Sequence, residues 1–519
     1  MNAIRSEGIT LTERYLSGLG QRSFLSLWSH SNLFRDKSKE LADLTVVCGN
    51  HVIIFSDKLI KFNESIDINT AWLRWYNKAV LASAKQLKRA KGWIMRHPDR
   101  IFFDNKCANA ACLFDNIDQD LEIHLVAVAN GAASPCIRHF EGGSGSLIVR
   151  PSENVKKPEL FSIGNPGGES EFIHVFNEAN LNIVLQELDT LGDLLSYLRA
   201  REKVFSNDSL LYAASEEDLL AFFLTDINEK GDHDFVVTSR QSLRGDKKFL
   251  IDEGLYNSYI TRPEYKRKKK ADKKSYLWDR MIERFSTNLN NGTLVPIPEE
   301  MSEFDGRHGG AEIGLRYMAL QPRVVRRAHV SAILGAFKSL SKAKADRFSR
   351  AMLPDSESGD GTGFFIILLN RKGVLSSWTE EEYRRYRSLL CYAYAQNLLM
   401  RRRDLLRVVG IATEGELGSG RSEDLIFQSQ LVWDEDIERK TYDLANKFNV
   451  FSNVSEQKFS EDEYPKTELG LRGGYAPIPY RFFEPPRLDD RHSIVGNRAQ
   501  RRAQKSRNRQ TSARGKRRR

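Results

Sequence analysis

The stretch from Lys39 to Lys58 constrains the fold of this chain more than any other part of the sequence. It reads KELADLTVVCGNHVIIFSDK, with two runs rich in β-branched residues on either side of Gly49-Asn50. Such runs favour strands, and a Gly-Asn pair suits a two-residue turn. The sequence therefore predicts a β-hairpin here.

The predicted turn also fixes which residues face each other. With residues 49 and 50 in the loop, Thr45 faces Ile54, and Asp43 faces Ser56. Side chains alternate along a strand. Asp43 and Ser56 therefore share one face with Lys58, at the end away from the turn. Asp57 points to the opposite face.

A carboxylate, a hydroxyl and an ammonium group thus gather at the open end of an otherwise apolar hairpin. One interpretation is a catalytic site. The other is that Asp43 and Lys58 form a strand-end ion pair, which is common and weakly stabilising.

Two helices are predicted around the hairpin. Residues 10–29 show helical spacing of apolar residues, with Glu13 in the first turn. Glu13 either interacts with the helix dipole or points at the hairpin end. Residues 66–94 predict a long helix with Gln86 on its apolar stripe and a basic remainder, which is either solvated or faces phosphates.

An acid on a first helix, an Asp-strand-turn-strand-Lys hairpin and a following long helix together resemble the PD-(D/E)XK nuclease superfamily. The resemblance covers about residues 8–150. It implies a restriction-endonuclease-like mixed sheet flanked by helices. It also implies that Asp43 is the metal-binding aspartate and that Ser56-Asp57-Lys58 stands where the family has its (D/E)XK triplet. Lys58 would then be the lysine of this triplet, and Ser56 would occupy its acidic position. Glu13 would match a first-helix acid, and Gln86 a helix glutamine near the site.

The implied chemistry is hydrolysis of a phosphodiester bond with Mg²⁺ or Mn²⁺, held by Glu13 and Asp43. Mg²⁺ takes oxygen ligands, activates water and polarises phosphate, and a lysine stabilises the developing charge. The sequence departs from the family at Ser56, because a neutral hydroxyl replaces a carboxylate. Glu13 or Glu40 would have to supply the missing charge. Asp57 lies in the triplet but on the other face.

Basic residues suggest where nucleic acid would bind. Residues 491–519 hold 12 of the 79 Lys and Arg residues and no acid, so the rest of the chain, with 69 acidic residues, is near neutral. This tail is expected to be disordered until bound. A second basic run, residues 262–274, is either a solvated loop or a nucleic-acid contact. The expected contacts are Lys268, Lys269, Lys270, Arg501, Arg502, Arg517 and Arg518.

The chain is predicted to be α/β (α+β) in class, with several domains because 519 residues exceed one ordinary core. A nuclease-like domain with a strand-rich extension is expected at 1–205 and a mostly helical domain at 206–360. A small α/β unit is expected at 361–490, and the basic tail at 491–519.

Metal and compartment signals are sparse. The five cysteines are few and odd in number, which is typical of a reducing, cytoplasmic compartment. Cys107 and Cys112 lack partners at zinc spacing. His124 and His174 lie in predicted strands and are interpreted as ordinary sheet residues. No apolar run is long enough for a membrane span, so no membrane partner is expected.

The leading functional hypothesis is a metal-dependent nuclease acting on DNA, with RNA as the alternative substrate; a role in defence against foreign DNA follows only from the resemblance. The first alternative is a catalytically inactive nuclease fold that still binds nucleic acid. The second is an RNA- or ribosome-associated factor that acts through its basic tail.

Overall fold

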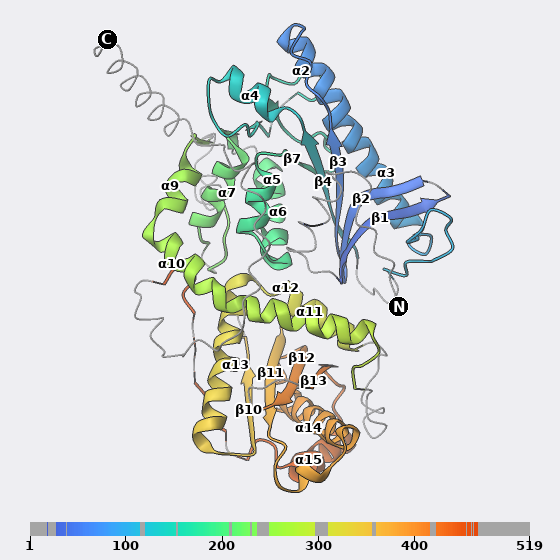
Figure 1. Cartoon of the computed structure of the whole chain (residues 1–519), viewed down its shortest axis with the longest axis vertical. Coiled ribbons are helices and arrows are strands. Elements are labelled where there is room, and N and C mark those ends of the chain that lie inside the picture. Colours follow the sequence, from blue (N-terminus) through green and yellow to red (C-terminus); the bar gives the residue numbers. More distant parts are fainter. Residues whose placement is uncertain are drawn as a thin grey trace, which may run out of the picture.

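The computed structural model describes residues 18, 27–37, 39–114, 120–151, 154–206, 210–228, 231–235, 249–295, 310–354, 360–415, 422–452, 454–457, 459 and 461–465. Over these residues the protein is a mixed α/β structure with sheets covered by helices (Figure 1). The predicted fold class is therefore confirmed. The predicted positions of Glu13 and of the tail arginines Arg501, Arg502, Arg517 and Arg518 lie outside the described residues.

The N-terminal sheet is built around the predicted hairpin. Its strand order is β1-β2-β3-β4-β7. The first three strands form an antiparallel meander, and β3, β4 and β7 run parallel. The bounds are β1 Ser29–Asp36, β2 Lys39–Cys48, β3 His51–Leu59, β4 Glu122–Asn130 and β7 Ile173–Phe176.

The two faces of this sheet are covered by different helices (Figure 1). One face packs against α2 (Ile68–Tyr76), the π-helix η1 (Asn77–Leu81) and α3 (Ala82–Arg96), which run as one continuous rod. The side chain of Asp67 caps its start by accepting a hydrogen bond from the backbone N–H of Thr70. The other face packs against α5 (Leu181–Glu187) and α6 (Leu191–Ser206).

The end of β4 approaches the neighbouring backbone closely at Gly131. Its φ is +105°, and a Cβ there would lie 2.1 Å from the carbonyl oxygen of Ile60. Both the conformation and the space therefore require glycine at this position. Next to it, the backbone N–H of Ile60 donates to the carbonyl oxygen of Asn130 at 3.1 Å, which holds the chain leaving β3 against the end of β4.

A small second sheet lies beside the first. Its order is β6-β5-β8-β9, from β5 Ile148–Val149, β6 Ser162–Ile163, β8 Leu210–Ala213 and β9 Phe249–Ile251. Helix α7 (Glu216–Thr225) packs on β8 and β9. The other helices of this part of the chain are α4 Ala133–His139, α9 Leu255–Thr261, α10 Pro263–Asp272, η3 Lys273–Ser275 and α11 Tyr276–Asn290.

The C-terminal sheet has the order β10-β11-β12-β13. Strand β10 comes from the region expected to be mostly helical, and it pairs with β11. The expected strand–helix–strand unit is present: β11 and β12 run parallel and are joined through α14, which starts with a capping box at Thr379 and Glu382. The bounds are α12 Gly310–Leu320, α13 Arg323–Ala343, β10 Arg347–Met352, β11 Thr362–Leu369, η5 Gly373–Ser377, α14 Glu380–Arg401, β12 Arg407–Glu414, β13 Glu423–Ser429 and α15 Glu435–Phe448.

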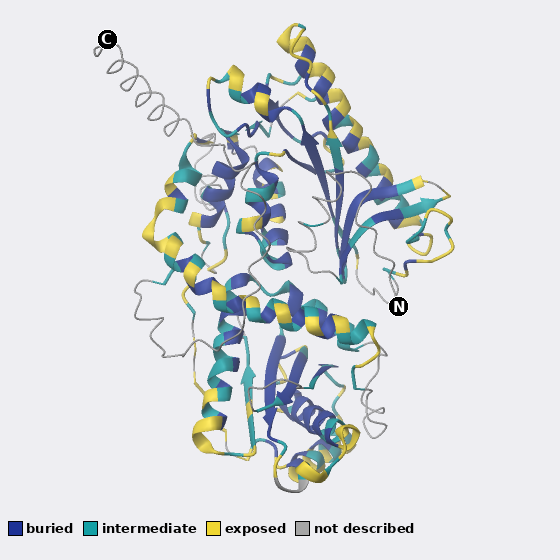
Figure 2. Ribbon diagram, viewed as in Figure 1, coloured by how far each residue is buried: buried dark blue, intermediate teal, exposed yellow. Residues whose placement is uncertain are grey.

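One hydrophobic core links the two large sheets. It runs from Phe55 on β3 through Leu198 on α6 and Trp278 on α11 to Phe364 on β11. In Figures 1 and 2, α11 and α12 lie between the two large sheets, and both helices contribute buried residues to this core. The predicted domain boundaries stay predictions, but this core crosses the first two of them, at 205/206 and 360/361. No described helix is long and apolar enough to span a bilayer.

Candidate functional site

The β2–β3 hairpin has the predicted register. Thr45 pairs with Ile54 and Val47 with Val52, and Gly49 in the turn has a φ of +62°. The regular pairing ends at Leu44 and Phe55, one residue before the predicted polar end.

Asp43 is buried and engaged with the backbone of the neighbouring strand. Its Oδ2 accepts a hydrogen bond from the backbone N–H of Asp57 at 2.5 Å. Only 6% of Asp43 is exposed. The carboxylate therefore holds β2 and β3 together where the regular pairing stops.

Ser56 is fully buried, and its hydroxyl donates to Oε1 of Gln86 at 3.3 Å. Gln86 lies on α3, which covers this face of the sheet. The structure thus brings together two of the residues that the sequence placed near the site. Both side chains are neutral, and neither adds a negative charge.

The remaining hairpin residues are spread over two faces. Asp57 points to the opposite face, as expected, and its Oδ1 accepts from Nδ2 of Asn130 at 2.7 Å. The pairing of β1 with β2 shifts register between Ala42 and Glu40, so side-chain alternation does not carry from Asp43 to Glu40. Lys58 is half-buried, and no ion pair joins it to Asp43 in the described part of the chain.

A basic hollow lies on the outer side of α3. We use this name for the open cavity of about 450 Å³ lined by Leu81, Ala84, Lys85, Lys88, Arg89, Gly92, Arg96 and Pro166. Four of these residues are cations and none is acidic. Within the described ranges, no carboxylate forms an ion pair with any of the four.

The hollow is formed by helical spacing and by a missing side chain. Lys85, Arg89 and Arg96 fall near one stripe because residues three and four apart are neighbours on a helix. Gly92 lies between them, and because it has no side chain the guanidinium of Arg96 lies over it, 3.5 Å from where a Cβ would stand. Lys88 Nζ donates to the carbonyl oxygen of Gly167 at 2.7 Å, which fixes the loop that forms the far wall.

The second basic run is not an exposed loop. It forms α10, and Lys268 is buried with ion pairs to Asp272 at 3.3 Å and Glu463 at 3.2 Å. These carboxylates raise the pKa of Lys268 despite its burial. Lys268 therefore cannot contact a phosphate in this fold, which corrects the prediction. Lys269 pairs with Glu187 at 2.8 Å. Lys270 lies on the same helix.

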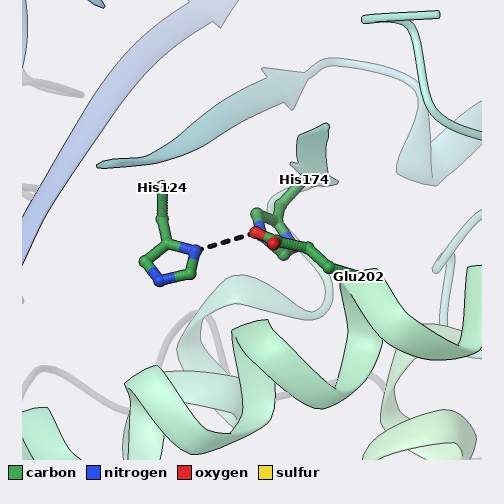
Figure 3. Close-up of side chains that lie close together, drawn as sticks. All are labelled: His124, His174 and Glu202. Atoms are coloured by element: carbon green, nitrogen blue, oxygen red, sulfur yellow. Dashed lines mark hydrogen bonds and ion pairs between the residues drawn. The ribbon is translucent and has the colours of Figure 1, made fainter. Parts of the chain in front are cut away.

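The structure also brings together residues that the sequence did not connect. His124 on β4, His174 on β7 and Glu202 on α6 form a cluster below the sheet (Figure 3). Glu202 Oε1 lies 2.8 Å from His124 Nδ1 and 3.0 Å from His174 Nε2. The histidines are 3% and 0% exposed. Among the described residues, this is the one group of three side chains placed to hold a metal ion.

Further charged groups surround the cluster. His124 Nε2 lies 2.9 Å from Glu122 Oε1, and Arg199 pairs with the same carboxylate at 2.5 Å. Behind His174, Arg201 is fully buried and forms two hydrogen bonds to Glu216, at 2.9 and 3.0 Å.

The environment shifts the pKa values of the cluster in different directions. Burial lowers the pKa of His174 to about 3, with Arg201 adding to the effect. Although burial opposes it, hydrogen bonds to Glu122 and Glu202 raise the pKa of His124. Although burial opposes this shift as well, hydrogen bonds from the two imidazoles lower the pKa of Glu202 to about 2. Glu202 is therefore a carboxylate and His174 a neutral imidazole at neutral pH.

The sequence could indicate that the two histidines are buried, but it could not identify their partner. His124 shares its face with the apolar Val126, and His174 shares its face with Phe176. A histidine at an inward position needs a polar partner. The identity of that partner, Glu202, depends on how α6 packs on the sheet.

Comparison of the chain with protein-family models, with curated proteins and with solved structures finds no match. The resemblance therefore rests on the residues of the N-terminal third alone.

Proposed function

We propose that this protein binds nucleic acid through the face formed by α3 and the open end of the β2–β3 hairpin. The observation that carries the proposal is the basic hollow, which gathers four cations with no acidic residue among its lining. Phosphate groups are the ligands that such an array attracts, because Lys and Arg neutralise them and release counterions.

The position of the hollow supports the link to the hairpin. Helix α3 carries Gln86 toward Ser56 on its sheet side and the cations on its outer side. A strand bound along the hollow would therefore lie on the domain that resembles a nuclease, on the side of α3 away from Ser56. The guanidinium of Arg96, which lies over Gly92, would be the group that meets a phosphate at this point.

Metal-dependent hydrolysis is the second candidate function. The observation in its favour is the hairpin register, which holds to Leu44 and Phe55 and, if continued, would put Asp43 and Lys58 on one face, as the resemblance requires. The described residues do not complete a magnesium site there: Asp43 is engaged by the Asp57 backbone, and Ser56 is uncharged and buried. Mg²⁺ would need Glu13 as well, so binding without hydrolysis ranks first.

Binding is tested with the full chain and fluorescent single-stranded DNA, duplex DNA and RNA of equal length. The test variant replaces Lys85, Arg89 and Arg96, all exposed in the hollow, by glutamine. The matched control removes the same charge from the exposed residues Lys338 and Lys342 of α13 and Lys344, the C-cap of that helix. We expect weaker binding only in the test variant. Equal affinities for both variants would refute the proposal.

Hydrolysis is tested with plasmid, linear and single-stranded substrates in Mn²⁺, beside Asp43→Ala and Lys58→Ala. Cleavage by the wild type that both substitutions abolish would establish the second candidate. Equal cleavage by all three proteins would mean a contaminant or a different site.

Deletion of residues 491–519 separates the tail from the folded domains. If RNA association disappears while the hollow variant binds normally, the protein acts through its tail instead. If RNA association survives the deletion, the hypothesis that the protein acts through its tail is wrong.

A further inference from the structure

We propose that His124, His174 and Glu202 bind a divalent transition metal ion of the zinc class. This site lies on the opposite face of the N-terminal sheet from Ser56 and α3, so it is separate from the nucleic-acid surface proposed above. It would join β4 and β7 to α6.

The donor atoms are already arranged around a common point. One ligand atom from each side chain lies within 4.8 Å of the others, and Glu202 Oε1 is nearest to both nitrogens. Zinc binds imidazole nitrogen and carboxylate oxygen at about 2.0–2.2 Å, so its tetrahedral ligands lie about 3.3 Å apart. The two oxygen–nitrogen distances, 2.8 and 3.0 Å, need to open by only a few tenths of an ångström to reach this spacing.

The surroundings of His124 are those of a metal ligand. Its Nε2 faces the carboxylate of Glu122, which leaves Nδ1 directed at the common point. A ligating histidine usually donates its other N–H to a carboxylate, because this fixes the ring and raises its basicity. Arg199 and His51 in turn hold Glu122, at 2.5 Å and 3.0 Å.

Solvent can reach the site through Glu202. About a third of its side chain is exposed, whereas both imidazoles are buried. The three protein ligands leave a fourth position for water, as in open zinc sites. Two imidazoles with one carboxylate select a borderline ion such as Zn²⁺ or Co²⁺ over Mg²⁺ or Ca²⁺, which prefer oxygen.

Arg201 limits the affinity of this site. Its Nη1 lies 3.4 Å from His174 Nδ1, at the edge of hydrogen-bond distance. With a metal ion on Nε2, a neutral His174 carries its proton on Nδ1, and the two donors face each other. The pairing of Arg201 with Glu216 compensates its charge but not this contact. We therefore expect weaker binding than at a closed structural zinc site.

The test uses the metal-stripped full chain, titrated with Co²⁺ and then with Zn²⁺ as competitor. We expect one Co²⁺ per chain with visible absorption typical of low coordination number, displaced by Zn²⁺. Zn²⁺ should also raise the thermal unfolding midpoint. X-ray absorption of the zinc complex should show nitrogen and oxygen neighbours without sulfur.

Variants assign the binding to the cluster. Glu202→Gln keeps the shape and neutral hydrogen bonding, and we expect it to weaken Co²⁺ binding at least tenfold. His124→Gln should do the same. The exposed His139→Gln and the double change Cys107→Ser with Cys112→Ser are controls that should bind as the wild type does.

Two results would overturn the proposal. One is the absence of stoichiometric Co²⁺ binding by a folded wild-type chain. The other is undiminished binding by Glu202→Gln with native circular dichroism. In either case the cluster is a hydrogen-bond network in which Glu202 accepts from both imidazoles.

Discussion

Salt dependence offers the sharpest test of the basic hollow. The perturbation is the triple substitution of Lys85, Arg89 and Arg96 by glutamine, which removes three of the four lining cations and leaves Lys88. These side chains extend outward from α3, away from the sheet. We expect the fold to survive and the electrostatic part of binding to fall.

The magnitude follows from the number of cations. Each phosphate contact contributes about −0.9 to the slope of log affinity against log salt for duplex DNA, and about −0.7 for a single strand. Removing three contacts should therefore make the slope shallower by about 2.7 or about 2.1. Between 50 and 200 mM salt, the affinity ratio of wild type to variant should shrink about 40-fold on duplex DNA. The basic tail contributes equally to both proteins and cancels from this ratio.

Fluorescence anisotropy at four or more salt concentrations measures the two slopes. The α13 variant, with Lys338, Lys342 and Lys344 replaced by glutamine, should keep the wild-type slope. Parallel lines for the wild type and the hollow variant would refute the reasoning, even if the variant bound more weakly overall, because a lost phosphate contact must change the slope.

Three further substitutions test the structure around these sites. Asp43→Ala should lower the free energy of unfolding by about 1–3 kcal/mol in urea denaturation, since it leaves the Asp57 N–H without its acceptor. Burial raises the pKa of Glu217 from 4.5 to about 7, so its contribution to stability is full below pH 4.5 and is lost as pH rises to about 7. The stability of Glu217→Gln relative to the wild type should therefore rise by about 3 kcal/mol between pH 4.5 and 8, and an unchanged difference would contradict this. Gly131→Ala should lower the thermal midpoint of unfolding, because its Cβ meets the Ile60 carbonyl oxygen.

The hairpin could be predicted because its constraints are local. Gly49 and Asn50 set the turn, and the turn sets the partner of every residue up to Leu44. The contact of Ser56 with Gln86 could also be predicted. The helical rod of α2, η1 and α3 is the next structure after the hairpin, and a glutamine on its apolar stripe needs a hydrogen-bond partner on the sheet side.

The residues that could not be predicted are those joined over long distances. His124 and Glu202 lie 78 residues apart and meet only because β4, β7 and α6 pack in one order. Lys268 belongs to a run whose composition indicated exposure. Asp272 one turn later and Glu463, almost two hundred residues away, bury it instead.

The direction in which each side chain of α3 points depends on how many residues the helical rod holds before it, and on the π-helix η1 within that rod. Each residue of an α-helix advances the direction of its side chain by about 100°, and a π-turn holds one residue more than an α-turn. Deleting one residue within Asn77–Leu81 would therefore return an α-turn and keep the downstream phase, whereas deleting one within the α-helical Ile68–Tyr76 would rotate everything downstream by about 100°. In that second case the two faces of α3 would change their surroundings. Leu87 would leave the core as the cation stripe swung toward the sheet. The buried apolar face of α3 and its outer row of cations therefore share one angular phase, and a change of phase displaces both.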